Sequence, residues 1–177
     1  PGGLAFKVAI ANKLVFSKIQ AALGGQVRWT VSGAAPLNKT IGEFFHACGV
    51  VILEGLGMTE NTSFTNVNRL DANKLGTVGQ VGPGIEMKLA EDGEILAKGP
   101  NIMKGYYNMP EATAEAIDAD GWLHSGDLGV MDADGYLAIT GRHKDMIIRG
   151  GENIYPREIE VFLYRLDGIA DVQVAGV

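Results

Sequence analysis

The feature that most constrains the fold is a strand–loop–helix–strand succession early in the chain. Residues 27–31 are rich in β-branched and aromatic side chains, and the small-residue loop 32–36 follows them. Residues 38–48 have a helical pattern, and residues 50–54 form a short apolar run that is typical of a buried parallel strand. This order predicts a βαβ unit and therefore a parallel region of an α/β sheet.

Two helices are predicted around this unit. Residues 4–23 repeat apolar side chains at helical spacing and end at the pair Gly24–Gly25, which predicts an amphipathic helix. In the helix over 38–48, Thr40 and Glu43 have the spacing of a capping box.

The pattern changes in the second half of the chain. From residue 76 to 140 the apolar segments are short, and 91–94 (EDGE) and 132–135 (DADG) are good tight-turn sequences. Pro110 indicates the start of a short helix over 110–117. This region is predicted to be a small antiparallel β unit.

The last segment predicts a small α+β arrangement. Residues 146–156 indicate a strand, a glycine loop and a second strand, residues 156–166 a helix, and residues 171–177 a further strand. Because that last strand ends the chain, we expect a fragment of a longer protein. Four parts are predicted. Residues 1–75 form an α/β nucleotide-binding part and residues 76–141 a β-rich subdomain. Residues 142–145 are a hinge, and residues 146–177 are the start of a mobile C-terminal domain.

Composition excludes several classes of protein. The net charge of −6 argues against a nucleic-acid partner, since phosphate backbones are bound by clustered Lys and Arg. The single cysteine, Cys48, allows no internal disulfide and fits a reduced cytosolic setting. No segment approaches the roughly 18 consecutive apolar residues that indicate a membrane-spanning helix. The 25 glycines lie between short apolar segments, which is typical of tight turns and backbone-lined binding loops.

Two loops follow the predicted parallel strands, where open α/β sheets bind ligands. The loop Ser32–Pro36 has side chains small enough for a flat ring to lie against the backbone. In Gly55–Glu60, the Thr59 hydroxyl suits a phosphate oxygen and the Glu60 carboxylate suits Mg²⁺. The alternatives are a plain βα turn for the first loop and a glycine turn with an exposed acid for the second.

A third motif, Gly121–Leu128, contains Asp127 between a glycine and an apolar residue. A carboxylate there can accept two hydrogen bonds from a ribose diol, although a turn aspartate that caps its own backbone is the alternative. His124 receives no catalytic assignment.

The fourth motif combines Thr140–Asp145 with Arg149–Glu160. Arg142 could donate to ribose or phosphate oxygens, and Gly150–Gly151 could form a loop that a narrow ligand arm passes. For Lys144 the alternative is a solvated pair with the adjacent aspartate.

In this order, the four motifs resemble those of the AMP-forming acyl-CoA synthetases, a family of the adenylate-forming ligase superfamily. The resemblance extends from about Val27 to Val177, and the opening segment KLVFSKIQAALGG is similar to bacterial long-chain fatty acid–CoA ligases. It implies a two-step reaction, in which ATP activates a carboxylic acid as acyl-AMP and the thiol of coenzyme A then takes the acyl group.

The resemblance also implies roles for single residues. Thr59 would contact phosphate, Glu60 would coordinate Mg²⁺, and both are the candidate catalytic residues. Asp127 and Arg142 would hold the nucleotide, and Lys144 would be the hinge of the C-terminal domain. Further contacts to nucleotide or coenzyme A are implied at Gly33, Ala34, Ala35, Glu54, Gly55, Leu56, Gly57, Ile139 and Gly151.

Three departures accompany the resemblance. Leu56 stands where the family often has an aromatic residue that stacks on adenine. The family's Ser/Thr/Gly-rich triphosphate loop and its adenylation lysine are both absent from these residues. We therefore expect the isolated chain to be inactive.

Several readings remain open at this point. The leading one is a fatty acid–CoA ligase that uses ATP, Mg²⁺ and coenzyme A. The others are a medium-chain or aryl acid–CoA ligase, a peptide-synthetase adenylation domain, and a non-catalytic nucleotide-binding fragment. We expect small-molecule partners and a cytoplasmic location, with a homodimer and peripheral association at the inner membrane face left open.

Overall fold

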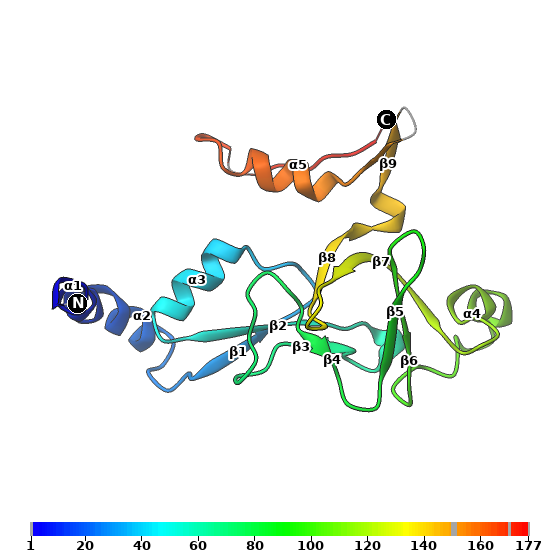
Figure 1. Cartoon of the computed structure of the whole chain (residues 1–177), viewed down its shortest axis with the longest axis horizontal. Helices are drawn as coiled ribbons and strands as arrows, with labels where there is room; N and C mark the ends of the chain where they lie inside the picture. Colours follow the sequence, from blue (N-terminus) through cyan, green and yellow to red (C-terminus); the bar gives the residue numbers. More distant parts are fainter. Residues whose placement is uncertain (1, 150–151, 170, 177) are drawn as a thin grey trace.

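The computed structural model describes residues 2–149, 152–169 and 171–176 (Figure 1). The chain opens with α1 (Gly2–Ala11), a π-helical turn (Asn12–Phe16) and α2 (Ser17–Ala22), close to the predicted helix. Most of its apolar side chains are exposed, Leu4 at 72% and Phe6 at 68%, whereas Phe16 and Ile19 are partly buried. The prediction of a helix is therefore confirmed, but none of the side chains described in α2 or in the π-helical turn is fully buried.

The first sheet contains the predicted βαβ unit. Strand β1 (Trp29–Ser32) leads through α3 (Lys39–Ala47) to β2 (Val51–Leu56), and the two strands pair in parallel. Antiparallel strands β3 (Asn66–Val67) and β4 (Gln80–Val81) extend the sheet in the order β1-β2-β3-β4. The parallel α/β prediction is thus confirmed.

The capping box predicted for α3 is wrong. Asn38 is the N-cap, and its Oδ1 accepts a 2.9 Å hydrogen bond from the backbone N–H of Thr40. Thr40 lies inside the helix, because the asparagine two residues earlier already satisfies its backbone donor.

The second sheet is antiparallel, in the order β5-β6-β7-β8. Both predicted turns form its hairpins, with Gly93 (φ +88°) and Gly135 (φ +81°) in the left-handed conformation that glycine accepts. The helix expected at Pro110 is α4 (Pro110–Ala116). The strands are β5 (Glu86–Leu89), β6 (Glu94–Lys98), β7 (Leu123–Met131) and β8 (Leu137–Arg142).

A shared core joins the two sheets. Leu56, at the end of β2, packs with Val78, Ile95 and Leu137, all of which are buried. The backbone N–H of Val78 also donates to the carbonyl of Leu137 at 2.8 Å. The loop that follows β2 is therefore fixed in position relative to β7 and β8.

The C-terminal segment stands apart from this body in Figure 1 and joins it through β8 and the 3₁₀ helix η3 (His143–Asp145). It contains the antiparallel pair β9 (Ile147–Arg149) and β10 (Glu152–Ile154), followed by α5 (Pro156–Leu163). No helix among the described residues has both the length and the apolar character to cross a membrane.

The strand predicted over 171–177 is absent from the part of it that the structure describes, residues 171–176. Side chains occupy its backbone donors instead. Asp171 accepts from the N–H of Val172, and Glu160 accepts from the N–H of Val174, each at 2.9 Å. Because neither donor faces a neighbouring strand, no ladder forms.

Candidate functional site

Two adjoining cavities lie beside the loop after β2. The first, of about 600 Å³, is lined by residues of that loop, of β7 and of η3. The second, of about 800 Å³, is lined by the loop after β1 and the loop after β2. Gly57 and Met58 line both cavities, so a ligand with two parts could occupy them together.

The loop after β2 is folded back on itself. A Cβ on Gly57 would lie 1.5 Å from the carbonyl oxygen of Ser63, so only glycine fits at that position. Thr62 (φ 53°) and Ser63 (φ 96°) have left-handed backbones, which is uncommon outside glycine and asparagine. A backbone of this kind persists where surrounding contacts hold it.

Asn101 supplies such contacts from outside the loop. Its Nδ2 donates to the carbonyl oxygens of Asn61 and Phe64, both at 3.0 Å. The hydroxyl of Thr62 donates in turn to the carbonyl of Asn101 at 2.7 Å. The segment after β6 therefore holds the shape of the loop after β2.

Glu60 lies in the first cavity and is held by the same segment. The Tyr106 hydroxyl donates a 2.8 Å hydrogen bond to Glu60 Oε1, and the N–H of Met103 donates to the Glu60 carbonyl at 2.7 Å. The hydrogen bond to the carboxylate raises the pKa of Tyr106 above its usual value.

The donor set around Glu60 fits magnesium bound together with a nucleotide. No group of three or more His, Cys, Asp or Glu side chains that could hold a metal occurs in the described part of the chain. Mg²⁺ commonly takes only one or two protein carboxylates and fills its shell with water and substrate phosphates. A single glutamate in a cavity of about 600 Å³, which has room for the other ligands, meets that requirement.

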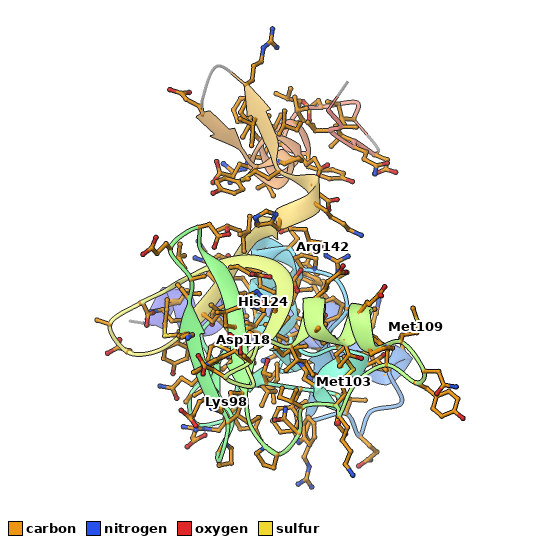
Figure 2. The ribbon with its side chains drawn as sticks, turned by 90° about the vertical axis from the view of Figure 1, so that its right-hand side faces the viewer. Lys98, Met103, Met109, Asp118, His124 and Arg142 are labelled. Atoms are coloured by element: carbon orange, nitrogen blue, oxygen red, sulfur yellow. The ribbon has the colours of Figure 1, made fainter. Side chains whose placement is uncertain are left out.

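Asp127 lies on β7 in the same cavity and is only 7% exposed. Arg142, opposite it on β8, donates through Nε to Asp127 Oδ1 at 3.1 Å. Figure 2 shows Arg142 at the junction between the body and the C-terminal segment.

Burial raises the pKa of the Asp127 carboxyl above its ordinary value, because the charged form is poorly solvated there. Arg142 opposes that shift through its charge and hydrogen bond, Asp145 adds to it, and Lys144 opposes it more weakly. The carboxylate is thus a buried acceptor that gains from a donor pair such as a sugar diol.

Most of the other residues predicted to form the site line one of the two cavities. Gly33, Ala34, Gly55, Leu56 and Thr59 line the second cavity, and Lys144 in η3 lines the first.

Three of them line neither cavity. Ala35 is exposed, and Ile139 packs against the shared core. Glu54 is buried, and its Oε1 accepts the N–H of Leu37 at 3.0 Å, which fixes the end of the loop after β1. Gly151 lies outside the described residues.

Sequence reasoning missed Tyr106, Asn101 and Glu94, which support the predicted residues. Glu94 was assigned only to a turn, and it lines the first cavity beside Asp127. The signal for Tyr106 was an aromatic pair next to a glycine, which has no specific meaning on its own. Only the fold brings these residues to the loops that they support.

Comparisons with known proteins place the chain in a family. The family model described as "AMP-binding enzyme" matches residues 5–107. The protein named as fatty-acid–CoA ligase FadD11 of Mycobacterium tuberculosis is 47% identical over 154 residues, which are 86% of this chain and 27% of that protein. Long-chain-fatty-acid–CoA ligase FadD15 of Mycobacterium bovis is 43% identical over 155 residues, 87% of this chain and 26% of that protein.

A solved structure is also similar. The o-succinylbenzoate–CoA synthetase MenE of Bacillus subtilis, in complex with ATP and a magnesium ion, superposes with a TM-score of 0.77 at 32% identity. The match covers 90% of this chain and 37% of that one. The chain thus spans about a quarter of the length of the curated relatives and about a third of this structure.

Proposed function

Since the chain belongs to the AMP-binding enzyme family, whose matched members include fatty acid–CoA ligases, we propose that it forms the nucleotide-binding and hinge part of such a ligase. In the first step, a carboxylate oxygen of the fatty acid attacks the α-phosphorus of ATP, and pyrophosphate leaves. In the second step, the sulfur of coenzyme A attacks the acyl carbon, AMP leaves, and the thiol proton is lost.

The observation that carries this proposal is the pair of adjoining cavities that Gly57 and Met58 share. The second cavity has the small and apolar lining that an adenine ring needs. The first contains the buried Asp127 carboxylate beside Arg142, which suits ribose hydroxyls. One nucleotide can therefore extend from one cavity into the other.

The phosphates would then reach the loop after β2. Thr59 offers a hydroxyl to a phosphate oxygen, and Glu60 would hold Mg²⁺ together with the phosphates. When bound, the metal would neutralise the charge that develops on the transferring phosphoryl group. The magnesium in the MenE complex supports this proposal.

The hinge role is proposed for Lys144. It lies in the three-residue helix η3, which is the described connection between β8 and the C-terminal segment. A short exposed link of this kind can absorb a change in backbone angles while both sides stay folded. A rotation there could exchange the groups facing the nucleotide between the two half-reactions. Gly151 keeps its proposed role at the pantetheine arm of coenzyme A.

The fatty acid is favoured over other carboxylic acids by the names of FadD11 and FadD15. A peptide-synthetase adenylation domain has no such support from these relatives.

The ribose role of Asp127 is tested by AMP binding. Asp127→Ala should weaken AMP binding to the chain by roughly tenfold or more, because a charged acceptor of two hydrogen bonds is lost. Asp134→Ala, in the exposed turn between β7 and β8, is the matched control. Equal affinity of wild type and Asp127→Ala would refute the proposed nucleotide site.

A further inference from the structure

The segment that carries Asp127 is a bulge in the β6–β7 ladder. Leu96 of β6 faces His124 of β7, and Glu94 faces Leu128, with an irregular register between them. Two steps along β6 (96 to 94) therefore correspond to four along β7 (124 to 128). The extra residues lift the backbone off the ladder, as bulges beside functional sites commonly do to redirect a side chain.

Both sides of this bulge are held by one carboxylate. Glu94 Oε1 accepts the backbone N–H of Gly126 at 2.9 Å, and Glu94 Oε2 lies 2.7 Å from His124 Nδ1. The Glu94 side chain is only 14% exposed, so water competes weakly for these contacts. Gly126 has a left-handed backbone (φ +72°), which glycine adopts without steric cost, and its N–H donates to Glu94 from that conformation.

The turn before β6 does not explain why the Glu94 carboxylate points toward β7. The turn is closed by Asp92, whose Oδ1 accepts the N–H of Glu94 at 3.1 Å, and by the left-handed Gly93. Those contacts use the backbone of Glu94 and leave its side chain directed at β7. Within the bulge itself, the Ser125 hydroxyl accepts the N–H of Asp127 at 3.1 Å.

We propose that Glu94 is a positioning residue, which holds the His124–Leu128 bulge and thereby places the Asp127 carboxylate in the first cavity. The inference rests on the proposed function, because Glu94 can affect nucleotide binding in this way only if Asp127 binds the nucleotide. Glu94 itself need not touch the nucleotide.

The first test is AMP affinity, measured by calorimetry on three single variants of the chain. Glu94→Ala should weaken AMP binding roughly tenfold, since it removes hydrogen bonds to a charged acceptor. Glu94→Gln keeps an acceptor for Gly126 and should recover most of that loss. Glu91→Ala, an exposed acid of the same hairpin, should bind as the wild type does.

The double variant Glu94→Ala/Asp127→Ala separates positioning from direct contact. If Glu94 acts through Asp127, the double variant should bind AMP no more weakly than Asp127→Ala alone. A further loss of the same size as in the single Glu94 variant would overturn the inference. If Asp127→Ala binds AMP like the wild type, the proposed function fails instead.

A second readout does not depend on nucleotide. The amide proton resonance of Gly126 should move upfield in Glu94→Ala, because the hydrogen bond to the carboxylate is lost, and only partly so in Glu94→Gln. The melting midpoint of each variant shows whether it is folded. An unchanged Gly126 resonance in a folded Glu94→Ala chain would contradict the inference.

Discussion

Arg142 lies directly opposite Asp127 in the β7–β8 ladder, and its Nε donates a 3.1 Å hydrogen bond to Asp127 Oδ1. The aspartate is buried, whereas the arginine side chain is more than half exposed. Arg142 therefore offsets only part of the cost of desolvating the Asp127 carboxylate. The pKa of Asp127 is raised because the effect of burial is larger than the effect of the arginine.

Replacing this arginine should raise the pKa of Asp127 further. The sign follows from the raised value: the folded chain favours the protonated carboxyl, so the free energy of unfolding falls as pH rises from 3.8 through the folded pKa. Arg142→Gln should extend this fall in the free energy of unfolding to higher pH, because only the folded pKa of Asp127 changes. The onset of AMP binding should move to higher pH as well. Carbon-13 NMR of the Asp127 carboxyl measures its pKa. Arg69→Gln is the control, since Arg69 pairs with Asp71 on the surface. A lower pKa in Arg142→Gln would contradict the account.

Tyr106→Phe should weaken the binding of magnesium–ATP several-fold. The variant removes the hydroxyl that donates to Glu60 and leaves the ring in place. Binding of ATP without metal should change much less, because Glu60 is assigned to the metal. Calorimetry with and without Mg²⁺ compares the two. Tyr107→Phe is the matched control, since that neighbouring side chain is 91% exposed. Equal losses with and without metal would exclude the role given to Tyr106.

Gly57→Ala should lower the free energy of unfolding by about 1–3 kcal/mol, the usual cost of overpacking. The added Cβ would meet the backbone carbonyl of Ser63, which cannot move without opening the loop after β2. Gly33→Ala is the control, since a Cβ there makes an ordinary 3.7 Å contact with the Gly55 carbonyl. Urea titrations of both variants give the comparison, and equal midpoints would show that the loop is looser than described.

Lys144→Pro should separate the two half-reactions in a longer ligase that carries these residues. Proline fixes φ near −65°, a value that the 3₁₀ helix η3 accepts but that restricts rotation at the link. Pyrophosphate release should continue while thioester formation falls, and Lys144→Ala should retain both. Equal loss of both half-reactions in the proline variant would count against a hinge at this position.

Much of the fold could be predicted from the sequence because its signals are local. The apolar run at 50–54, the turns at Gly93 and Gly135, and Pro110 each determine a nearby element. The capping error at Thr40 shows the limit, since one asparagine earlier in the chain decided where the helix begins.

The site could be predicted only in part. Asp127 and Glu60 lie in motifs with a recognisable order, and the structure brings them to one cavity. Glu94 and Tyr106 act through contacts 32 and 46 residues away in the chain, with Gly126 and Glu60 respectively. Such partners depend on strand register and on a bulge, neither of which has a local signature.

The most direct test of the central claim is whether a longer ligase that carries these 177 residues turns over ATP only when a carboxylic acid substrate is present. Mass spectrometry would follow AMP, pyrophosphate and acyl-CoA for carboxylic acids from two to eighteen carbons, with and without coenzyme A. The account predicts that a fatty acid yields AMP and its CoA thioester in equal amounts, and that Asp127→Ala abolishes most of both. Release of ADP, or turnover that no carboxylic acid stimulates, would contradict it.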